Sequence, residues 1–506
     1  MKKCLTALLF LLLITQAPFA QNNNLILEGL RPLDEVPIAN MPALDNKQLI
    51  AEELARRAPG IPPKFAESIE VNINPNTDGL WENAPNGMKV WRLRVYSAGA
   101  KSLNFGFSNY QMPPNGKLLL YKSDRSTALG PFTPADNEDH NQLWTPVLEG
   151  EEIVIEVQVP ANEKSKLNLE LSYVNHDYMD FIKMSSGVNG SGSCNIDVIC
   201  GEADGWGIID NYRDIIRSVA MYSLNGVEAC TGFLINNTNS DCTPFFMTAA
   251  HCGLNSGNAS SLVTYWNFQS PECRQPGSSS SGGPGNGVLE DFNTGSLHRV
   301  TYGPSDVTLV ELDDPVSSTA NAFFAGWSIE YLMPQDTVIC IHHPDTDEKR
   351  ITFEFDPTVP TIGGANQVPI DEANHIRVPG WDLGTTEGGS SGSPLFNNEK
   401  QVVGQLHGGA ASCFNAANND DTDDWDYYGW FYTSWYGGGT PNTALRFWLD
   451  PYDTGFETWY GKENCSYNMA ATPYYRELCA PEEAVYELEN NSACDGAVTL
   501  TTANVA

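Results

Sequence analysis

The chain has 506 residues, 41% of them hydrophobic, and a formal net charge of −35. This length suffices for two or three domains with sizeable cores. The strong negative charge argues against a nucleic-acid partner, because both molecules would be anionic. It fits either solubility outside the cell or attraction of basic substrates.

Residues 1–20 have the pattern of a secretory signal peptide. Lys2 and Lys3 precede the apolar run Leu8–Ile14, and the small residue Ala20 ends the segment. The run is too short and wrongly flanked for a membrane span, and no other stretch approaches that length. We therefore expect a secreted, soluble and monomeric extracellular protein, with attachment to the cell surface left open.

The cysteines indicate the same compartment. Cys4 leaves with the signal peptide, so 11 of the 12 cysteines remain in an oxidising environment. There they predict disulfides rather than metal ligands. The odd count leaves one thiol over, or indicates that the chain is incomplete. We expect neither a metal nor another cofactor.

Residues 21–183 predict a β-rich domain without cysteine. A short helix is expected over Leu49–Ala58, followed by alternating strands at Lys89–Tyr96, Lys117–Tyr121 and Glu152–Val157. A cysteine-free segment between a signal peptide and a disulfide-bearing region is typical of a removable propeptide. A permanent binding module is the alternative.

Residues 184–460 predict two β barrels followed by a helix. The helix is expected over Ala444–Leu449, capped by Asn442 or Thr443 and ended by Pro451. The expected strands of the first barrel are Ser218–Leu224, Ala229–Ile235 and Pro244–Ala250. Those of the second are Thr337–Ile341, Arg350–Phe355, His375–Val378, Ser393–Phe396 and Gln401–Leu406.

Three motifs in this region supply the groups that acyl transfer requires, which are a nucleophile, a base, a group that orients the base, and donors for the oxyanion. Ser391 lies in the glycine-rich turn Gly388–Leu395, His251 follows an apolar run, and Asp306 precedes another. Each motif alone is weak, since glycine-rich turns and core histidines are common. Their chain order, His-Asp-Ser, is that of the chymotrypsin fold and differs from those of subtilisin and the α/β-hydrolases.

The chain also carries the motifs SGSCNIDV, ACTG, TAAHCG, SDVTLVEL, IHHP with EKRI, GSSGSP, GQLHGG and YTSW. In these it resembles the bacterial lysyl endopeptidases, a secreted branch of the chymotrypsin-like serine proteases. The resemblance implies an all-β fold, a chymotrypsin-like double six-stranded β-barrel with a C-terminal helix, preceded by a β-rich propeptide. It implies His251 as general base, Asp306 as the group that orients it and Ser391 as nucleophile. The N–H groups of Gly389 and Ser391 would form the oxyanion hole.

Cleavage after basic residues requires a further carboxylate. In trypsin-like enzymes it lies six residues before the serine, where this chain has Thr385. In the lysyl endopeptidases it follows the GQLHGG strand, and the matching residue is Asp426. A pocket sized for the compact lysine ammonium excludes the broader guanidinium of arginine. A solvated acidic loop or a calcium site over 420–426 is the alternative.

His407 matches a histidine that shapes the binding site of that family. An aromatic partner is expected beside it, but at 361–365 this chain has Thr-Ile-Gly-Gly-Ala instead of a tryptophan. The resemblance therefore does not extend to this part of the site.

Lysine is unevenly distributed along the chain. Residues 21–183 contain nine lysines, whereas residues 184–506 contain three lysines and eight arginines. A protease that cuts after lysine benefits from few lysines in its mature body, although drift in composition would produce the same contrast. Lys183 would then be the self-cleavage site that releases the propeptide.

The resemblance further implies the disulfides Cys194–Cys413, Cys200–Cys273 and Cys230–Cys252. Cys242 and Cys340 are extra and are candidates to pair, although sequence does not determine connectivity. Residues 461–506 look like the start of a further β module or a sorting region. Their cysteines are Cys465, Cys479 and Cys494.

We predict a secreted serine endopeptidase that cleaves lysine-containing proteins or peptides on the carboxyl side of lysine through an acyl-enzyme. A protease of the same fold with broader Lys/Arg specificity is one alternative. A surface binding protein on a protease scaffold is the other, although such a protein has no reason to keep His251, Asp306 and Ser391 together.

Overall fold

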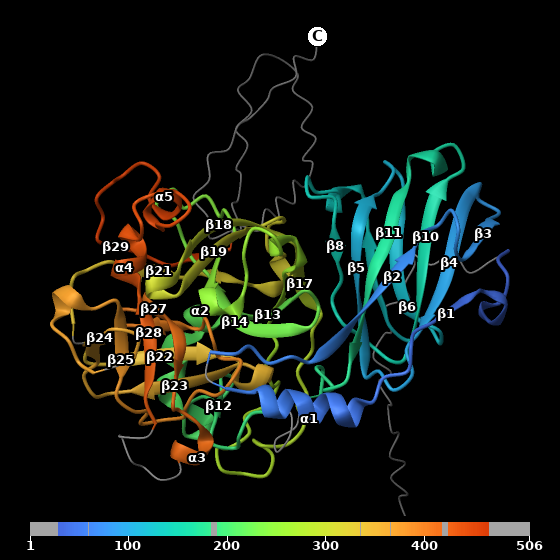
Figure 1. The fold of residues 1–506 in the computed structure, drawn as a ribbon. Helices are drawn as coiled ribbons and strands as arrows, with labels where there is room; N and C mark the ends of the chain where they lie inside the picture. Colours follow the sequence, from blue (N-terminus) through green and yellow to red (C-terminus); the bar gives the residue numbers. More distant parts are fainter. Residues whose placement is uncertain are drawn as a thin grey trace, which may run out of the picture.

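The computed structural model describes residues 29–58, 60–183, 190–333, 335–364, 366–416 and 424–464. Two β-rich parts lie side by side, with the N-terminal part on the right and the part that carries the three motifs on the left in Figure 1. The expected signal peptide and most of the expected 461–506 extension, with Cys465, Cys479 and Cys494, lie outside the described residues.

The N-terminal part is a sandwich of two mainly antiparallel sheets. One has the order β1-β4-β10-β6-β7 with β3 beside β4, and the other has the order β2-β11-β5-β8 with β9 beside β5. Their facing side chains form one apolar core that includes Trp91, Phe105 and Val157. The strands are β1 Ile38–Asn40, β2 Ala66–Ile73, β3 Leu80–Asn83, β4 Met88–Tyr96, β5 Ser102–Gln111, β6 Lys117–Lys122, β7 Ala128–Phe132, β8 Leu143–Trp144, β9 Leu148–Glu149, β10 Glu152–Pro160 and β11 Asn168–Asp177.

Helix α1 spans Asn46–Arg56 and so begins before the predicted start at Leu49. Asp45 caps it, because its carboxylate accepts hydrogen bonds from the N–H groups of Lys47 (3.1 Å) and Gln48 (3.2 Å). The cap explains the earlier start. The helix lies at the lower centre of Figure 1, between the two parts, and leads the chain toward the catalytic part.

The first catalytic sheet has seven strands in the order β17-β16-β13-β14-β15-β19-β18. His251 lies in the short turn of helix η6, which follows β15, and Asp306 directly precedes β19. The predicted strands of this barrel are present as β13, β14 and β15. The strands are β13 Val219–Leu224, β14 Glu228–Leu234, β15 Phe245–Ala249, β16 Val263–Trp266, β17 Asp291–Thr294, β18 Ser296–Tyr302 and β19 Val307–Leu312; η6 is Ala250–Cys252.

The second catalytic sheet follows the order β12-β23-β22-β26-β27-β28-β25-β24, with β21 beside β27 and β29 beside β21. Ser391 precedes β26, His407 lies in β27 and Asp426 begins β28. The strands are β12 Ile196–Asp197, β21 Gly326–Ser328, β22 Val338–His342, β23 Arg350–Glu354, β24 Val359–Thr361, β25 His375–Val378, β26 Pro394–Phe396, β27 Gln401–Gly409, β28 Asp426–Trp430 and β29 Thr458–Trp459.

Both sheets share one apolar cluster, to which Met247 and Leu309 contribute from the first sheet and Ile341 and Val402 from the second. This is the chymotrypsin-like all-β fold that the resemblance implied. The sheets contain seven and ten strands rather than six each.

The C-terminal helix is shorter than expected. Helix α5 spans only Arg446–Leu449, and its N-cap is Leu445, without a side-chain cap. The predicted cap is wrong, because the Thr443 hydroxyl hydrogen-bonds within its own turn, to Thr440 (2.7 Å between hydroxyl oxygens). Past residue 460, strand β30 (Lys462–Glu463) pairs with β20 (Phe323–Phe324), so the chain still packs on the catalytic part there.

Backbone pairing and apolar packing join the two parts of the molecule. The N–H of Phe65 donates to the carbonyl of Val227 (2.9 Å), and the N–H of Ala229 donates to that of Pro63 (3.0 Å). A shared cluster includes Phe65, Trp144, Phe181, Met221 and Tyr265. Because apolar burial is the main driving force of association, a cut in the connecting chain near residue 183 would leave this interface in place.

Candidate active site

His251, Asp306 and Ser391 meet where the two catalytic sheets face each other. The Nδ1 atom of His251 lies 2.7 Å from Asp306 Oδ2, and its Nε2 atom lies 2.8 Å from Ser391 Oγ. Asp306 is only 3% exposed, and its Oδ1 accepts the backbone N–H of His251 (2.8 Å). In this geometry Nε2 can take the serine proton while the carboxylate holds the Nδ1–H.

Asp306 is held by contacts that sequence reasoning missed. Its backbone lies in the left-handed region (φ 53°), which aspartate tolerates better than most residues. Its carbonyl accepts the N–H of Ala250 (2.8 Å) and Nε2 of Gln405 (3.2 Å). The only sequence signal for Gln405 was its place in the GQLHGG motif. Strand β27 thus helps to position the carboxylate.

The turn before Ser391 leaves two N–H groups without an acceptor among the described residues. Gly389 has φ +86°, and a Cβ there would lie 2.6 Å from the backbone N of Thr346, so glycine is required. The carbonyl of Gly388 accepts the N–H of Asp345, which turns the N–H of the same peptide, that of Gly389, the opposite way. Among the described residues no acceptor receives the N–H of Gly389 or Ser391. Both are available to an oxyanion.

Asp426 is buried at the start of β28, with 1% exposure. Its Oδ2 accepts hydrogen bonds from Trp381 Nε1 (2.8 Å) and Thr386 Oγ1 (2.6 Å). Its Oδ1 faces Gly409, where a Cβ would approach within 2.1 Å. Burial raises the pKa of Asp426 to about 7, and the charge of Asp424 contributes to the rise. No cation in the described part of the chain opposes this shift.

Thr385 occupies the trypsin-like position without a charge of its own. Its Oγ1 donates to Asp424 Oδ1 (3.0 Å), so a carboxylate does lie beside this position. Sequence reasoning did not single out Asp424 from the acidic run. The rest of that run, 420–423, lies outside the described residues, and with it the alternative of a calcium site or solvated loop there.

His407 lies against the ring of His251, with ring centroids 5.3 Å apart and planes 16° apart. Its Nδ1 lies 3.0 Å from His375 Nε2 and 3.7 Å from Asp306 Oδ2. Tyr427 supplies an aromatic neighbour, with its ring centroid 4.7 Å from that of His407. Burial lowers the pKa of His407, and lowers that of His375 to about 4. Sequence reasoning missed both His375 and Tyr427.

His251, Asp306 and His407 also have the geometry of a potential metal site. One ligand atom from each lies within 4.8 Å of the others, and they are the one such group within the described ranges. The hydrogen bond between His251 and Asp306 already explains this proximity. We therefore interpret the group as part of the candidate proteolytic machinery.

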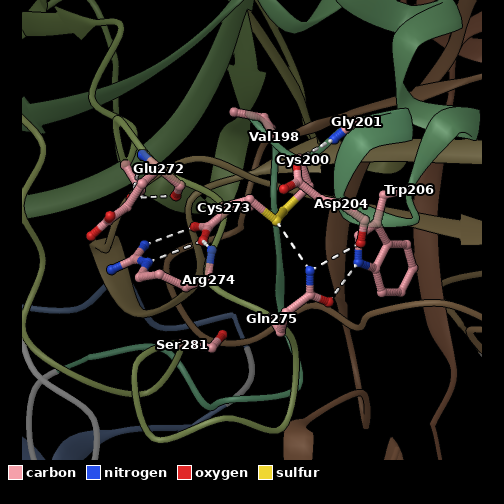
Figure 2. Close-up of a disulfide and its surroundings, with 12 residues drawn as sticks. Val198, Cys200, Gly201, Asp204, Trp206, Glu272, Cys273, Arg274, Gln275 and Ser281 are labelled. Atoms are coloured by element: carbon pink, nitrogen blue, oxygen red, sulfur yellow. Dashed lines mark hydrogen bonds and ion pairs between the residues drawn. A yellow bond between two sulfur atoms is a disulfide. The ribbon is translucent and has the colours of Figure 1, made fainter.

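All three disulfides that the resemblance implied are present, as Cys194–Cys413, Cys200–Cys273 and Cys230–Cys252. The third ties β14 to the residue after His251. Figure 2 shows the second, beside which the Gln275 side chain donates to the carbonyl of Asp204 (3.0 Å) and accepts from Trp206 Nε1 (3.1 Å). This bridge therefore lies in a hydrogen-bonded loop junction.

The suggested pairing of Cys242 with Cys340 is wrong. Cys242 is disulfide-bonded, whereas Cys340 is a buried free thiol. The two belong to different apolar clusters, and Cys340 hydrogen-bonds to Ser393 Oγ (3.2 Å) inside the second sheet. Their separate positions in the fold explain why they do not meet.

Lys183 does not lie with Asp426. Its ammonium contacts Glu149 of the N-terminal part, and its side chain is 55% exposed.

The residues after α1, by contrast, lie near the candidate site. Arg57 Nη1 is 3.2 Å from Asp345 Oδ1, and a Cβ on Gly408, next to His407, would lie 3.8 Å from the N atom of Gly60.

Two family models cover most of the chain. Residues 188–429 match the model described as "Lysyl endopeptidase, C-terminal domain", and residues 41–177 match the "Lysyl endopeptidase N-terminal domain". The chain belongs to the lysyl endopeptidase family. It is therefore a serine endopeptidase. A lysyl endopeptidase of Pseudomonas aeruginosa is 28% identical over 384 residues, which are 72% of this chain and 79% of that protein.

Solved protease structures show partial similarity to the endopeptidase. The active form of the Rv3671c protease from M. tuberculosis covers 44% of this chain and 82% of its own, with 17% identity and a TM-score of 0.26. A Glu endopeptidase in complex with MPD covers 42% and 85%, with 15% identity and a TM-score of 0.26. No helix among the described residues is long and apolar enough to cross a membrane.

Proposed function

We propose that the endopeptidase is secreted as a zymogen and cleaves peptide bonds on the carboxyl side of lysine. Asp426 carries this proposal, because a buried carboxylate without a cationic partner is costly and a lysine ammonium would relieve that cost. The glycine at 409 leaves one carboxylate oxygen uncovered by a side chain. The lysine ammonium carries three donors on a flexible stem. It can therefore reach a carboxylate through a narrower opening than the planar guanidinium of arginine needs.

In the proposed reaction, Ser391 Oγ attacks the carbonyl carbon of the lysine residue while His251 Nε2 takes the hydroxyl proton. The oxyanion accepts hydrogen bonds from the N–H groups of Gly389 and Ser391. His251 then protonates the leaving amine, which leaves an acyl-enzyme on Ser391. Water attacks the acyl group with His251 again as base, and the product leaves with a new carboxylate. Asp306 holds the imidazole in place throughout.

We further propose that residues 21–183 are the propeptide, that Arg57 and Gly60 hinder access to the site, and that cleavage after Lys183 activates the enzyme. Because Lys183 contacts Glu149 rather than Asp426, the cut would be made by a second molecule. Full-length Ser391→Ala protein should stay uncut alone and be cut at Lys183 when active enzyme is added. The same mature N-terminus in Ser391→Ala protein, with no other protease present, would overturn self-processing.

The decisive experiment is digestion of a denatured protein mixture by the processed enzyme, with cut sites mapped by mass spectrometry, alongside Asp426→Asn. We expect cuts after lysine that the variant loses. Cuts after arginine at similar rates would favour the broader Lys/Arg protease. Unchanged cutting by Asp426→Asn would move the specificity to another residue, and no cutting at all would return us to the binding-protein alternative.

A further inference from the structure

Asp424 and Asp426 lie on the same side of the chain that enters β28. Side chains two residues apart along an extended strand point to one face, and the N–H of Ala410 donates to the carbonyl of Trp425 (2.8 Å), so the β pairing continues past the start of β28. Both aspartates are buried, Asp424 at 4% exposure. Two buried carboxylates thus lie close enough for the charge of Asp424 to raise the pKa of Asp426.

Two adjacent threonines hold these carboxylates. Thr386 Oγ1 donates to Asp426 Oδ2 (2.6 Å), and Thr385 Oγ1 donates to Asp424 Oδ1 (3.0 Å). The backbone N–H of Ser412 also donates to Asp424 Oδ1 (3.0 Å). Since Thr385 is six residues before Ser391, Asp424 brings a charge to the place where trypsin-like enzymes carry theirs.

The second oxygen of Asp424 has no partner. Its Oδ2 is buried and makes no hydrogen bond within the described residues. The nearby charge of Glu387 is also negative, and burial followed by such repulsion raises the pKa of Asp424. An unpartnered buried carboxylate oxygen costs free energy, which a nearby cation would recover.

We propose that Asp424 supplies a second negative charge to the specificity pocket, so that a basic side chain is recognised by two carboxylates rather than by Asp426 alone. This inference rests on the proposed function. Asp426 is the residue that would contact the lysine ammonium, and Asp424 is a specificity-determining residue that strengthens the field around it. Coulomb attraction over several ångström in a partly buried site is worth on the order of tenfold in affinity.

The test is Asp424→Asn, which keeps the shape and the acceptor for Thr385 and Ser412 but removes the charge. Peptide substrates that differ only by lysine or norleucine before the scissile bond separate charge from shape. We expect kcat/KM for lysine to fall about tenfold, mainly through KM. The rate for norleucine, which has the stem without the ammonium, should not change, and the melting temperature should hold or rise.

The matched control is Asp382→Asn, an exposed aspartate on the approach to the same two threonines, whose Oδ2 accepts the N–H of Phe355 (2.9 Å). It should leave the lysine-to-norleucine ratio unchanged. An unchanged ratio in Asp424→Asn, or an equal loss on both substrates, would overturn the proposal. So would recovery of neither Asp424→Asn nor Asp424→Ser as folded protein, since that assigns Asp424 a structural role. If the wild-type enzyme did not prefer the lysine substrate over the norleucine substrate, the proposed function itself would be wrong.

Discussion

The N-terminal and catalytic parts of the molecule differ in the number of their lysines and in how far these are exposed. None of the nine lysines between residues 21 and 183 is buried. In the catalytic part Lys349 is 1% exposed, its Nζ donates to the carbonyl of Ile216 (3.1 Å), and burial lowers its pKa to about 7. Lys400 pairs with Asp214 (3.0 Å), and Lys462 donates to the carbonyl of Ser240. The proposed mature enzyme thus offers few accessible lysines to itself.

The two parts also differ in what holds them together. The N-terminal sandwich has an apolar core and no cysteine. The catalytic part has the disulfides Cys194–Cys413, Cys200–Cys273 and Cys230–Cys252, and Cys242 is disulfide-bonded as well. It also has a buried ion cluster in which Asp197 pairs with Arg274 (2.7 Å) and Arg350 (2.5 Å). Disulfides between distant segments oppose the local unfolding by which a chain becomes accessible to a protease. This difference agrees with our proposal that the catalytic part survives digestion and that the N-terminal part is removed.

Ser391→Ala should abolish removal of the N-terminal part, which is the largest effect that we expect. Loss of the nucleophile lowers kcat by about a millionfold, so the N-terminal part should remain intact alongside the catalytic part in purified protein. Gel analysis and mass spectrometry over days would show this, with Ser393→Ala on the neighbouring serine as control. Loss of the N-terminal part from Ser391→Ala protein would mean that another protease removes it.

Removal of the Cys230–Cys252 bridge by a double alanine substitution should weaken only the catalytic part. Loss of a native disulfide costs about 2–4 kcal/mol, and the bridge lies next to His251. Calorimetry of the processed N-terminal and catalytic parts should show a lowered transition for the catalytic part alone. An equal shift of both transitions would contradict the separation we describe.

Acidification should slow digestion of the N-terminal part. Because burial raises the pKa of Asp426 to about 7, protonation below that pH removes the charge that would bind lysine. The rate constant kcat/KM for lysine substrates should fall about tenfold per pH unit on this limb, beyond any fall measured with norleucine substrates. Identical pH profiles for the two substrates would exclude Asp426 as the titrating group.

Arg57→Ala should have the smallest effect. The ion pair with Asp345 (3.2 Å) is partly exposed, and such pairs contribute about 1 kcal/mol or less. The cleaved N-terminal part should bind and inhibit the catalytic part a few fold more weakly, measured by titration of activity. Arg31→Ala, which removes a pair with Glu35 inside the N-terminal part, is the matched control and should change nothing.

Sequence patterns by themselves determined the local elements and the order of the chemistry. Strand alternation located β4, β13 and β15 to within a residue or two. The glycine-rich turn pointed to Ser391 as the candidate nucleophile, and its Oγ lies 2.8 Å from His251 Nε2. The resemblance supplied the disulfide pairs, because three distant cysteine pairs cannot be read from spacing. The local elements depend on neighbours along the chain, and the disulfide pairs were inferred from the family that the chain resembles.

Only the tertiary structure decided what lies between distant segments. The bond from Thr385 to Asp424, the contact of His375 with His407, and the partners of Lys183 join residues brought together by sheet packing. The same packing places Cys242 and Cys340 in different apolar clusters. The Thr443 hydroxyl hydrogen-bonds to Thr440 in its own turn instead of capping α5. Such contacts depend on where whole strands lie in space. The local periodicity of a sequence carries no record of that position.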